Sequence, residues 1–244
     1  MKLKLLLLTG LLFGASVEAA FSASISRSTD SCLVALDEAI GQYKKYEAIR
    51  EQRIDRLKNQ LKRLSFSDLK SYNLNYALYI EYKSYICDSA LYYLNLNMKW
   101  AKQYGDSYLV SKNCILLAHL MTSAGMYEEA SEKLRQLDNV KLSPKLLSDY
   151  YDSYCRFYGE VGAYTQDNSS KKRYFLLSRS YEDSLLKIFS PGSYAHLERR
   201  ALRKMTDGDV KGALMINDTL LNGLNIDSPK YALDRKSTRL NFSH

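Results

Sequence analysis

The chain has few of the residues that interrupt helices, with 3 prolines and 11 glycines among 244 residues. It also lacks β-branched runs separated by hairpin dipeptides, which argues against a β-rich fold. A composition of 46% hydrophobic and 25% charged residues argues against disorder and is enough for a sizeable core. An all-α protein is therefore expected, either as one globular body or as one helical array.

Catalytic and metal-binding motifs are also lacking. The sequence has no Gly-x-Ser-x-Gly, no phosphate-cradling glycine loop and no HExxH. Apart from His244, the histidines are His119 and His196, and neither has a second histidine or a carboxylate at ligand spacing on its helix face. We expect no catalytic residue, no metal site and no cofactor. An enzyme is the third hypothesis, and it would require a convergent cluster of acid, base or metal ligands.

The four cysteines are dispersed and form no CxxC pair. In an oxidising compartment two of them could form a disulfide. Cys87 and Cys114 lie at packing positions where a small apolar side chain suffices, so buried thiols are the preferred interpretation. The four are Cys32, Cys87, Cys114 and Cys155.

Residues 1–19 have the pattern of a signal peptide. MKLK is a short basic segment, LLLLTGLLFGA is an apolar run too short to span a bilayer comfortably, and small residues lead to Ala19. The alternative, a buried first helix, would leave the leucine run without a polar face. We predict Sec-type export, with cleavage near Ala19 and a periplasmic or extracytoplasmic location.

Residues 234–244, DRKSTRLNFSH, resemble one reading frame of a sequencing-adapter oligonucleotide. We interpret them as a non-native tail on a chain truncated near Leu233; the alternative is a basic disordered tail. The formal net charge is +8, and without residues 1–19 and 234–244 it falls to +5, with 30 basic and 25 acidic residues. Such a mild excess forms no stripe for tracking phosphates, so nucleic acid is not an expected partner.

Two basic clusters, Lys171-Lys172-Arg173 and Arg199-Arg200-Arg203-Lys204, are interpreted as solvated helix faces. They remain possible docking points for an acidic partner.

A long amphipathic helix is predicted from about Ser31 to Leu64, and with a short linker it forms the segment 20–64. Glu47 and Arg50 interrupt its apolar stripe, so a long coiled coil is not supported. At its end Ser65 is expected to cap the next helix, with Asp68 in the third helical position. The apolar positions are Leu36, Ile40, Tyr43, Ile54, Leu57, Leu61 and Leu64.

The stretch LAHLMTSAGMYEEASEKL, residues 117–134, has the pattern of a helix-turn-helix unit. Ala118 and Ala130 are small residues that allow two helices to cross closely, and Gly125 tolerates the positive φ of a turn. Tyr127 is expected to pack back onto the first helix. Leu117 and Leu134 occupy further structural positions of the repeat.

Weaker copies extend this unit into an array over residues 65–233. Ala90 lies forty residues before Ala130, and Ala201, Gly208 and Ala213 repeat the spacing of the alanine and glycine positions. Between them lies a degenerate, aromatic-rich helix pair without an alanine at its crossing. Each proline follows a serine, so each is expected to open a helix; the three are Pro144, Pro191 and Pro229.

These units resemble the tetratricopeptide repeat (TPR), which implies a TPR-like α-solenoid preceded by the long amphipathic helix. The chain also resembles a family of exported TPR proteins of Gram-negative gut-type bacteria, often labelled regulators, on LDEAIGQYKKYEAIREQRIDRLKNQL, EYKSYICDSALYYL and SPGS. That resemblance implies a C-terminal domain of unknown function after a transmembrane helix, hence membrane anchoring only through sequence missing here.

The tyrosines Tyr72, Tyr76, Tyr79 and Tyr82 recur at three and four residues. One interpretation is that they fill wide gaps between helices. The other is an aromatic face for binding a partner, because stacked helix pairs present a continuous surface.

The preferred function is a non-catalytic, exported protein-interaction module with a protein or peptide partner. We expect it to be the sensing or scaffolding part of a longer membrane-anchored, regulator-like protein. The alternative is a free periplasmic TPR adaptor for envelope assembly, which needs no downstream membrane helix.

Overall fold

The computed structural model describes residues 33–34, 36–38 and 40–223. The expectations for the signal peptide, Cys32, Pro229 and the tail at 234–244 lie outside these residues. The chain divides into two compact units, Met1–Leu64 and Ser65–His244, and each is described by itself.

The first unit contains the helix α2, Tyr43–Leu61, and further helical residues precede it within 33–41. Of its predicted apolar stripe, Ile54 is fully buried, whereas Leu36 and Ile40 are more than half exposed. The stripe is therefore buried most completely near its C-terminal end.

The second unit is helical, and no strand occurs among the described residues of either unit. This confirms the predicted all-α class. Its helices are α3 Leu69–Tyr82, α4 Cys87–Gln103, α5 Ser107–Ser123, α6 Tyr127–Arg135, α7 Pro144–Tyr164, α8 Asn168–Ile188, α9 Tyr194–Thr206 and α10 Val210–Asn222.

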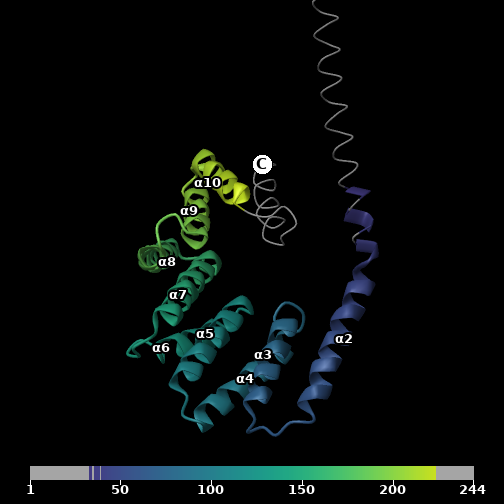
Figure 1. Ribbon diagram of the computed structural model, residues 1–244. Coiled ribbons are helices and arrows are strands. Elements are labelled where there is room, and N and C mark those ends of the chain that lie inside the picture. Colours follow the sequence, from purple (N-terminus) through teal and green to yellow (C-terminus); the bar gives the residue numbers. More distant parts are fainter. Residues whose placement is uncertain (1–32, 35, 39, 224–244) are drawn as a thin grey trace, which may run out of the picture. The chain divides into compact units, whose positions relative to one another are not determined.

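Consecutive helices pack as hairpins, α3 with α4, α5 with α6, α7 with α8 and α9 with α10. Neighbouring hairpins also pack through α4 on α5, α5 on α7 and α6 on α7. Figure 1 shows the helices of this unit following one another from blue through teal and green to yellow. This repeated helix-turn-helix packing is the TPR-like solenoid predicted from the sequence.

The alanines of the repeat pattern lie buried in these hairpins. Ala118 on α5 and Ala130 on α6 are fully buried, as is Ala90 on α4. In the last hairpin, Ala201 is 4% exposed and Ala213 is 1% exposed. A methyl side chain lets two helix backbones approach closely, so each of these sites limits the size of its residue.

Glycines with positive φ form the turns of two hairpins. Gly125 has a φ of +77° between α5 and α6, and Gly208 has a φ of +80° between α9 and α10. The Gly125 amide donates to the carbonyl of Thr122, and the following amide of Met126 donates to Met121. The left-handed residue thus satisfies carbonyls that the end of α5 leaves open.

The α7–α8 hairpin uses glycine where the others use alanine. A Cβ placed on Gly162 would lie 3.2 Å from the ring of Phe175. One turn earlier, Gly159 faces Ser178, whose Oγ donates to the Cys155 carbonyl over 2.8 Å. The helix pair without alanine therefore still has small residues at its crossing.

Two helix starts differ from the prediction. Asp68, not Ser65, caps α3 by accepting from the Lys70 amide, because its extended backbone stands one residue before the helix. Pro191 lies in the turn before α9, which Ser193 caps by accepting from His196. Pro144 does open α7 behind Ser143, as predicted.

The Tyr127 ring lies beside α7 of the next hairpin. Its centroid lies 6.4 Å from that of Phe157 and 6.1 Å from that of Tyr164, both on α7. The reason is that Tyr127 is the first residue of α6, which packs against α7 of the next hairpin. Tyr127 therefore joins two hairpins.

A buried polar contact ties the first hairpin to the second. The side-chain amide of Asn97 on α4 donates to the Tyr72 carbonyl over 3.1 Å. The amide of Asn113 on α5 donates to the Tyr72 hydroxyl over 3.2 Å, and both asparagines are fully buried. Tyr72 thus connects α3 with α4 and α5 by hydrogen bonds in a water-poor interior, where such bonds are directional.

None of the described helices is long and apolar enough to cross a membrane.

Replacing Ala130 by Trp or Gly125 by Val should destabilise the second unit. Ala130 is fully buried at a crossing, so a large ring overpacks it by about 1–3 kcal/mol or more. Gly125 has open space around an added Cβ, so valine there incurs only the backbone strain of positive φ, about 1–3 kcal/mol. Urea denaturation followed by far-UV circular dichroism measures both losses.

Glu129→Trp, next to Ala130 but exposed, and Gly41→Val, in a helical glycine without a close neighbour, are the matched controls. If Ala130→Trp loses no more stability than Glu129→Trp, the crossing role of Ala130 is wrong. If Gly125→Val loses no more than Gly41→Val, the turn role of Gly125 is wrong.

Candidate functional site

The first helices of three consecutive hairpins, α3, α5 and α7, line a groove of about 480 Å³ that we call the first-helix groove. α3 contributes Tyr76 and Tyr79, α5 contributes Lys112 and His119, and α7 contributes Asp149 and further polar residues. The groove is therefore built from residues far apart in the sequence, which the repeat packing brings together.

Charges of both signs line this groove. Lys83, Lys112 and Lys145 are its cations, and Asp149 and Asp152 on α7 are its carboxylates. The Lys112 Nζ lies 4.4 Å from the centroid of the Tyr76 ring. A cation over an aromatic face is held in place by the ring quadrupole, so Lys112 is oriented before any partner arrives.

His119 lies half-buried among these groups. Burial lowers its pKa, Arg156 lowers the pKa further, and Asp152 opposes the shift. Since the ordinary pKa of histidine is about 6.5, His119 is neutral at pH 7 and offers one donor and one acceptor to the groove.

Three of the four tyrosines predicted as a partner-binding face are almost fully buried. Tyr72, Tyr79 and Tyr82 are each 4% exposed, whereas Tyr76 is half-buried, and Tyr76 and Tyr79 line the groove. The Tyr72 ring packs against Trp100 on α4 with the two rings tilted by 56°, and the Tyr82 ring stacks on that of Tyr93. The four therefore form no common exposed face. Their spacing places them on one side of α3, and that side is largely buried by neighbouring helices.

A second cavity, of about 470 Å³, continues the groove between α7 and α9. Asp152 lines both cavities, so they adjoin on α7. The first helices of four hairpins thus contribute to one run of surface cavities.

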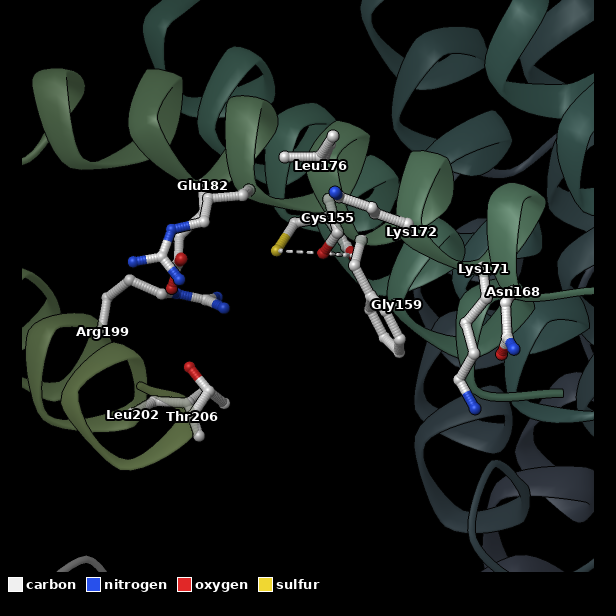
Figure 2. A pocket seen from close by; sticks show the side chains of 13 residues that line it. Cys155, Gly159, Asn168, Lys171, Lys172, Leu176, Glu182, Arg199, Leu202 and Thr206 are labelled. Atoms are coloured by element: carbon white, nitrogen blue, oxygen red, sulfur yellow. Dashed lines mark hydrogen bonds between the residues drawn. The ribbon is translucent and has the colours of Figure 1, made fainter. Parts of the chain in front are cut away.

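The largest of the three cavities, about 860 Å³, lies between α8 and α9 and is called the α8–α9 pocket. Figure 2 shows Asn168, Lys171 and Lys172 on one side of its opening and Arg199, Leu202 and Thr206 on α9 across from them. Cys155 and Gly159 of α7 also line it. It adjoins the cavity between α7 and α9 through residues that the two share.

Ion pairs hold the last hairpin against the preceding one. Arg203 on α9 contacts two acidic residues of α8, Glu182 over 2.7 Å and Asp183 over 2.6 Å. Arg199 pairs with Asp152 of α7. The cluster of basic residues predicted as a solvated face is therefore partly engaged, and the side chain of Glu182 is only 11% exposed.

In a fourth ion pair the arginine lies on α8 and the carboxylate follows α9. Arg179 on α8 donates two hydrogen bonds to Asp207, over 2.5 Å and 2.7 Å. The Arg179 guanidinium holds the pKa of Asp207 below its ordinary value. The pair therefore stabilises the folded chain above the ordinary carboxyl pKa, and this contribution is lost as the pH falls through the lowered one.

The sequence model of a family described as the SusR N-terminal TPR domain matches residues 40–238. The chain belongs to this family. The match begins within the N-terminal helical residues and continues through every hairpin described above. Searches of curated proteins and of solved structures found no match to this chain.

Membership in the SusR N-terminal TPR domain family fits an interaction role. The TPR fold is typically a non-catalytic scaffold for protein partners, and its surface is used along the stacked helices. Among residues 33–34, 36–38 and 40–223, no group of three or more His, Cys, Asp or Glu side chains is placed to hold a metal ion. Cys87, Cys114 and Cys155 are free thiols, with Cys114 the most buried.

Sequence reasoning missed the α8–α9 pocket and treated its lysines as part of a solvated face. The sequence did contain one signal for ion pairing. Arg199 and Arg203 lie four residues apart, so they share a helix face, and the preceding helix carries the acidic pair Glu182-Asp183. The pairing of α9 with α8, which sequence spacing does not specify, was needed to use that signal.

Arg203→Met should lower the free energy of unfolding by about 2–4 kcal/mol, because it leaves the buried carboxylate of Glu182 without its counter-charge. Urea denaturation measures the loss, and hydrogen exchange should place the faster-exchanging amides in α9 and α10.

Arg200→Met removes a neighbouring exposed arginine and serves as the control. Equal stability of the two variants would show that the Arg203 pair does not hold the hairpin.

Proposed function

We propose that the chain is an exported protein-interaction module that binds a protein or peptide partner in the first-helix groove. In this proposal it is the sensing or scaffolding part of a longer membrane-anchored, regulator-like protein. Membership in the SusR N-terminal TPR domain family supports the interaction role. The short apolar run at the N-terminus supports export.

One observation carries the binding site: three successive first helices converge on one groove with oriented polar groups. Lys112 is already positioned over Tyr76, and neutral His119 adds a donor and an acceptor. A partner segment lying along the groove would contact three hairpins at once. Preorganised contacts of this kind lower the entropy lost on binding.

The groove also suits a partner with both charges. Its lysines are Lys83 after α3, Lys112 on α5 and Lys145 at the start of α7, and its carboxylates are Asp149 and Asp152, of which Asp152 is paired with Arg199. A segment that carries both acidic and basic side chains would match these charges.

A photo-crosslinking residue in place of Tyr76 should capture the partner in the source cells. Tyr76 is half-buried in the groove, so benzoylphenylalanine there keeps an aromatic ring beside Lys112. We expect a discrete crosslinked band whose partner peptide is identified by mass spectrometry, and Lys112→Glu should weaken that band.

Tyr92 on α4 is 59% exposed and does not line the groove, so the same substitution there is the control. Equal capture of the same protein from both positions would contradict binding in the groove.

Fractionation of the source cells tests export and anchoring together. With an affinity tag inserted in the chromosomal copy of the gene, we expect the protein outside the cytoplasm, with its N-terminus starting after Ala19, and held in the membrane fraction.

A full-length protein with an intact N-terminus in the cytoplasm would contradict export. Release of all the tagged protein as a free periplasmic species would instead favour the envelope-assembly adaptor.

A further inference from the structure

The α8–α9 pocket has an apolar surface that the fold leaves uncovered. Phe175 is 43% exposed, Leu176 is 61% exposed and Leu202 on α9 is 51% exposed, and all three line the pocket. Single exposed apolar residues are ordinary on proteins, but a group of large ones in one hollow marks an interaction site.

The charge beside this apolar surface is positive. Of the cations that line the pocket, Arg179 is paired with Asp207 and Arg199 with Asp152. Lys171 and Lys172 also line it, and neither has an ion-pair partner in the described part of the chain. The one lining carboxylate, that of Glu182, is already held by Arg203. The uncompensated charge of the pocket therefore favours an acidic ligand.

The exposure of the apolar residues indicates the size of the ligand. A site for a small molecule encloses most of its ligand, whereas Leu176 and Leu202 remain more than half exposed here. A hollow lined by two helices with apolar side chains on each is suited to a third amphipathic helix. Lys171 and Lys172, one turn before Leu176, would then meet acidic residues beside the apolar stripe of that helix.

Two segments outside the hairpins, 33–64 and 224–233, do not have the acidic composition of such a helix. Residues 224–233 contain one acidic residue, Asp227, and one basic residue, Lys230. Residues 33–64 contain eight basic and five acidic residues, so they carry the same sign as the pocket. An acidic helix of a partner protein has the complementary charge.

We propose that the α8–α9 pocket binds an acidic amphipathic helix of a partner protein, with its apolar side against Phe175, Leu176 and Leu202 and its carboxylates at Lys171 and Lys172. It rests on the proposed function only in treating the chain as an interaction module, since the pocket shares no lining residue with the first-helix groove.

Fluorescence anisotropy with the full chain tests this proposal. The probe is a labelled, end-capped peptide of about 14 residues, with Leu at every third or fourth position and Glu elsewhere, and a second probe has Lys in place of each Glu. We expect saturable binding of the acidic probe, weakened by added salt, and no saturable binding of the basic one.

Two pairs of variants locate the binding. Lys171→Glu with Lys172→Glu should weaken the acidic probe about tenfold or more, whereas Lys187→Glu with Lys211→Glu, an equal charge change outside the pocket, should change it less than about twofold. Leu176→Asp should also weaken it, and Met215→Asp, at a residue 73% exposed on α10, should not. Thermal denaturation checks that every variant is folded.

Equal effects of pocket and control variants would overturn the proposal, as would absence of saturable binding or a preference for the basic probe. Binding of dodecanoate in the pocket without binding of the acidic peptide would assign the pocket to small anionic amphiphiles and also overturn it. None of these outcomes alters the crosslink expected from Tyr76, so the two proposals fail separately.

Discussion

Close crossing of paired helices is the constraint on which this structure depends. Two helix backbones can approach only where the side chains between them are small, and here Ala118 with Ala130 and Ala201 with Ala213 occupy buried crossing positions. Gly162 does the same against Phe175 in the pair that has no alanine. The closed hairpins then pack on one another through α4 on α5 and α5 on α7, and the first helices α3, α5 and α7 line the groove.

Much of the fold could be predicted because its signals are local. A small residue, a turn glycine and a second small residue at fixed spacing specify a hairpin wherever they occur, and Ser143 with Pro144 specifies a helix start. The errors arose where two residues could serve the same local role. Ser65 and Asp68 can both cap α3, and only the backbone conformation at Asp68 decides between them. Pro191 follows a serine as Pro144 does, yet Ser193 is the cap.

The candidate surfaces were less predictable because they depend on contacts between hairpins. The period that groups Tyr72, Tyr76, Tyr79 and Tyr82 is equally compatible with burial and with exposure. Three of them are only 4% exposed, and Tyr72 and Tyr82 pack against aromatic rings of α4. Likewise, Lys171 and Arg199 look alike in the sequence. In the fold one has no ion-pair partner within the described residues, whereas the other is bound to Asp152 of a neighbouring helix.

The hydrogen bonds centred on Tyr72 make the first hairpin specific to its place. Its carbonyl accepts from Asn97 and its hydroxyl accepts from Asn113. The Asn113 amide also donates to the Leu109 carbonyl of its own helix, so one of its two N–H groups uses the tyrosine hydroxyl of the hairpin before it. The last hairpin instead meets its neighbour through arginine and carboxylate side chains. Exchanging the two hairpins would leave one buried N–H group of Asn113 without its partner at one junction and acidic side chains without theirs at the other. The contacts at the junctions thus specify the order of the hairpins. Recombination between repeats of this chain is disfavoured because it would break these contacts, even though the repeats share one fold.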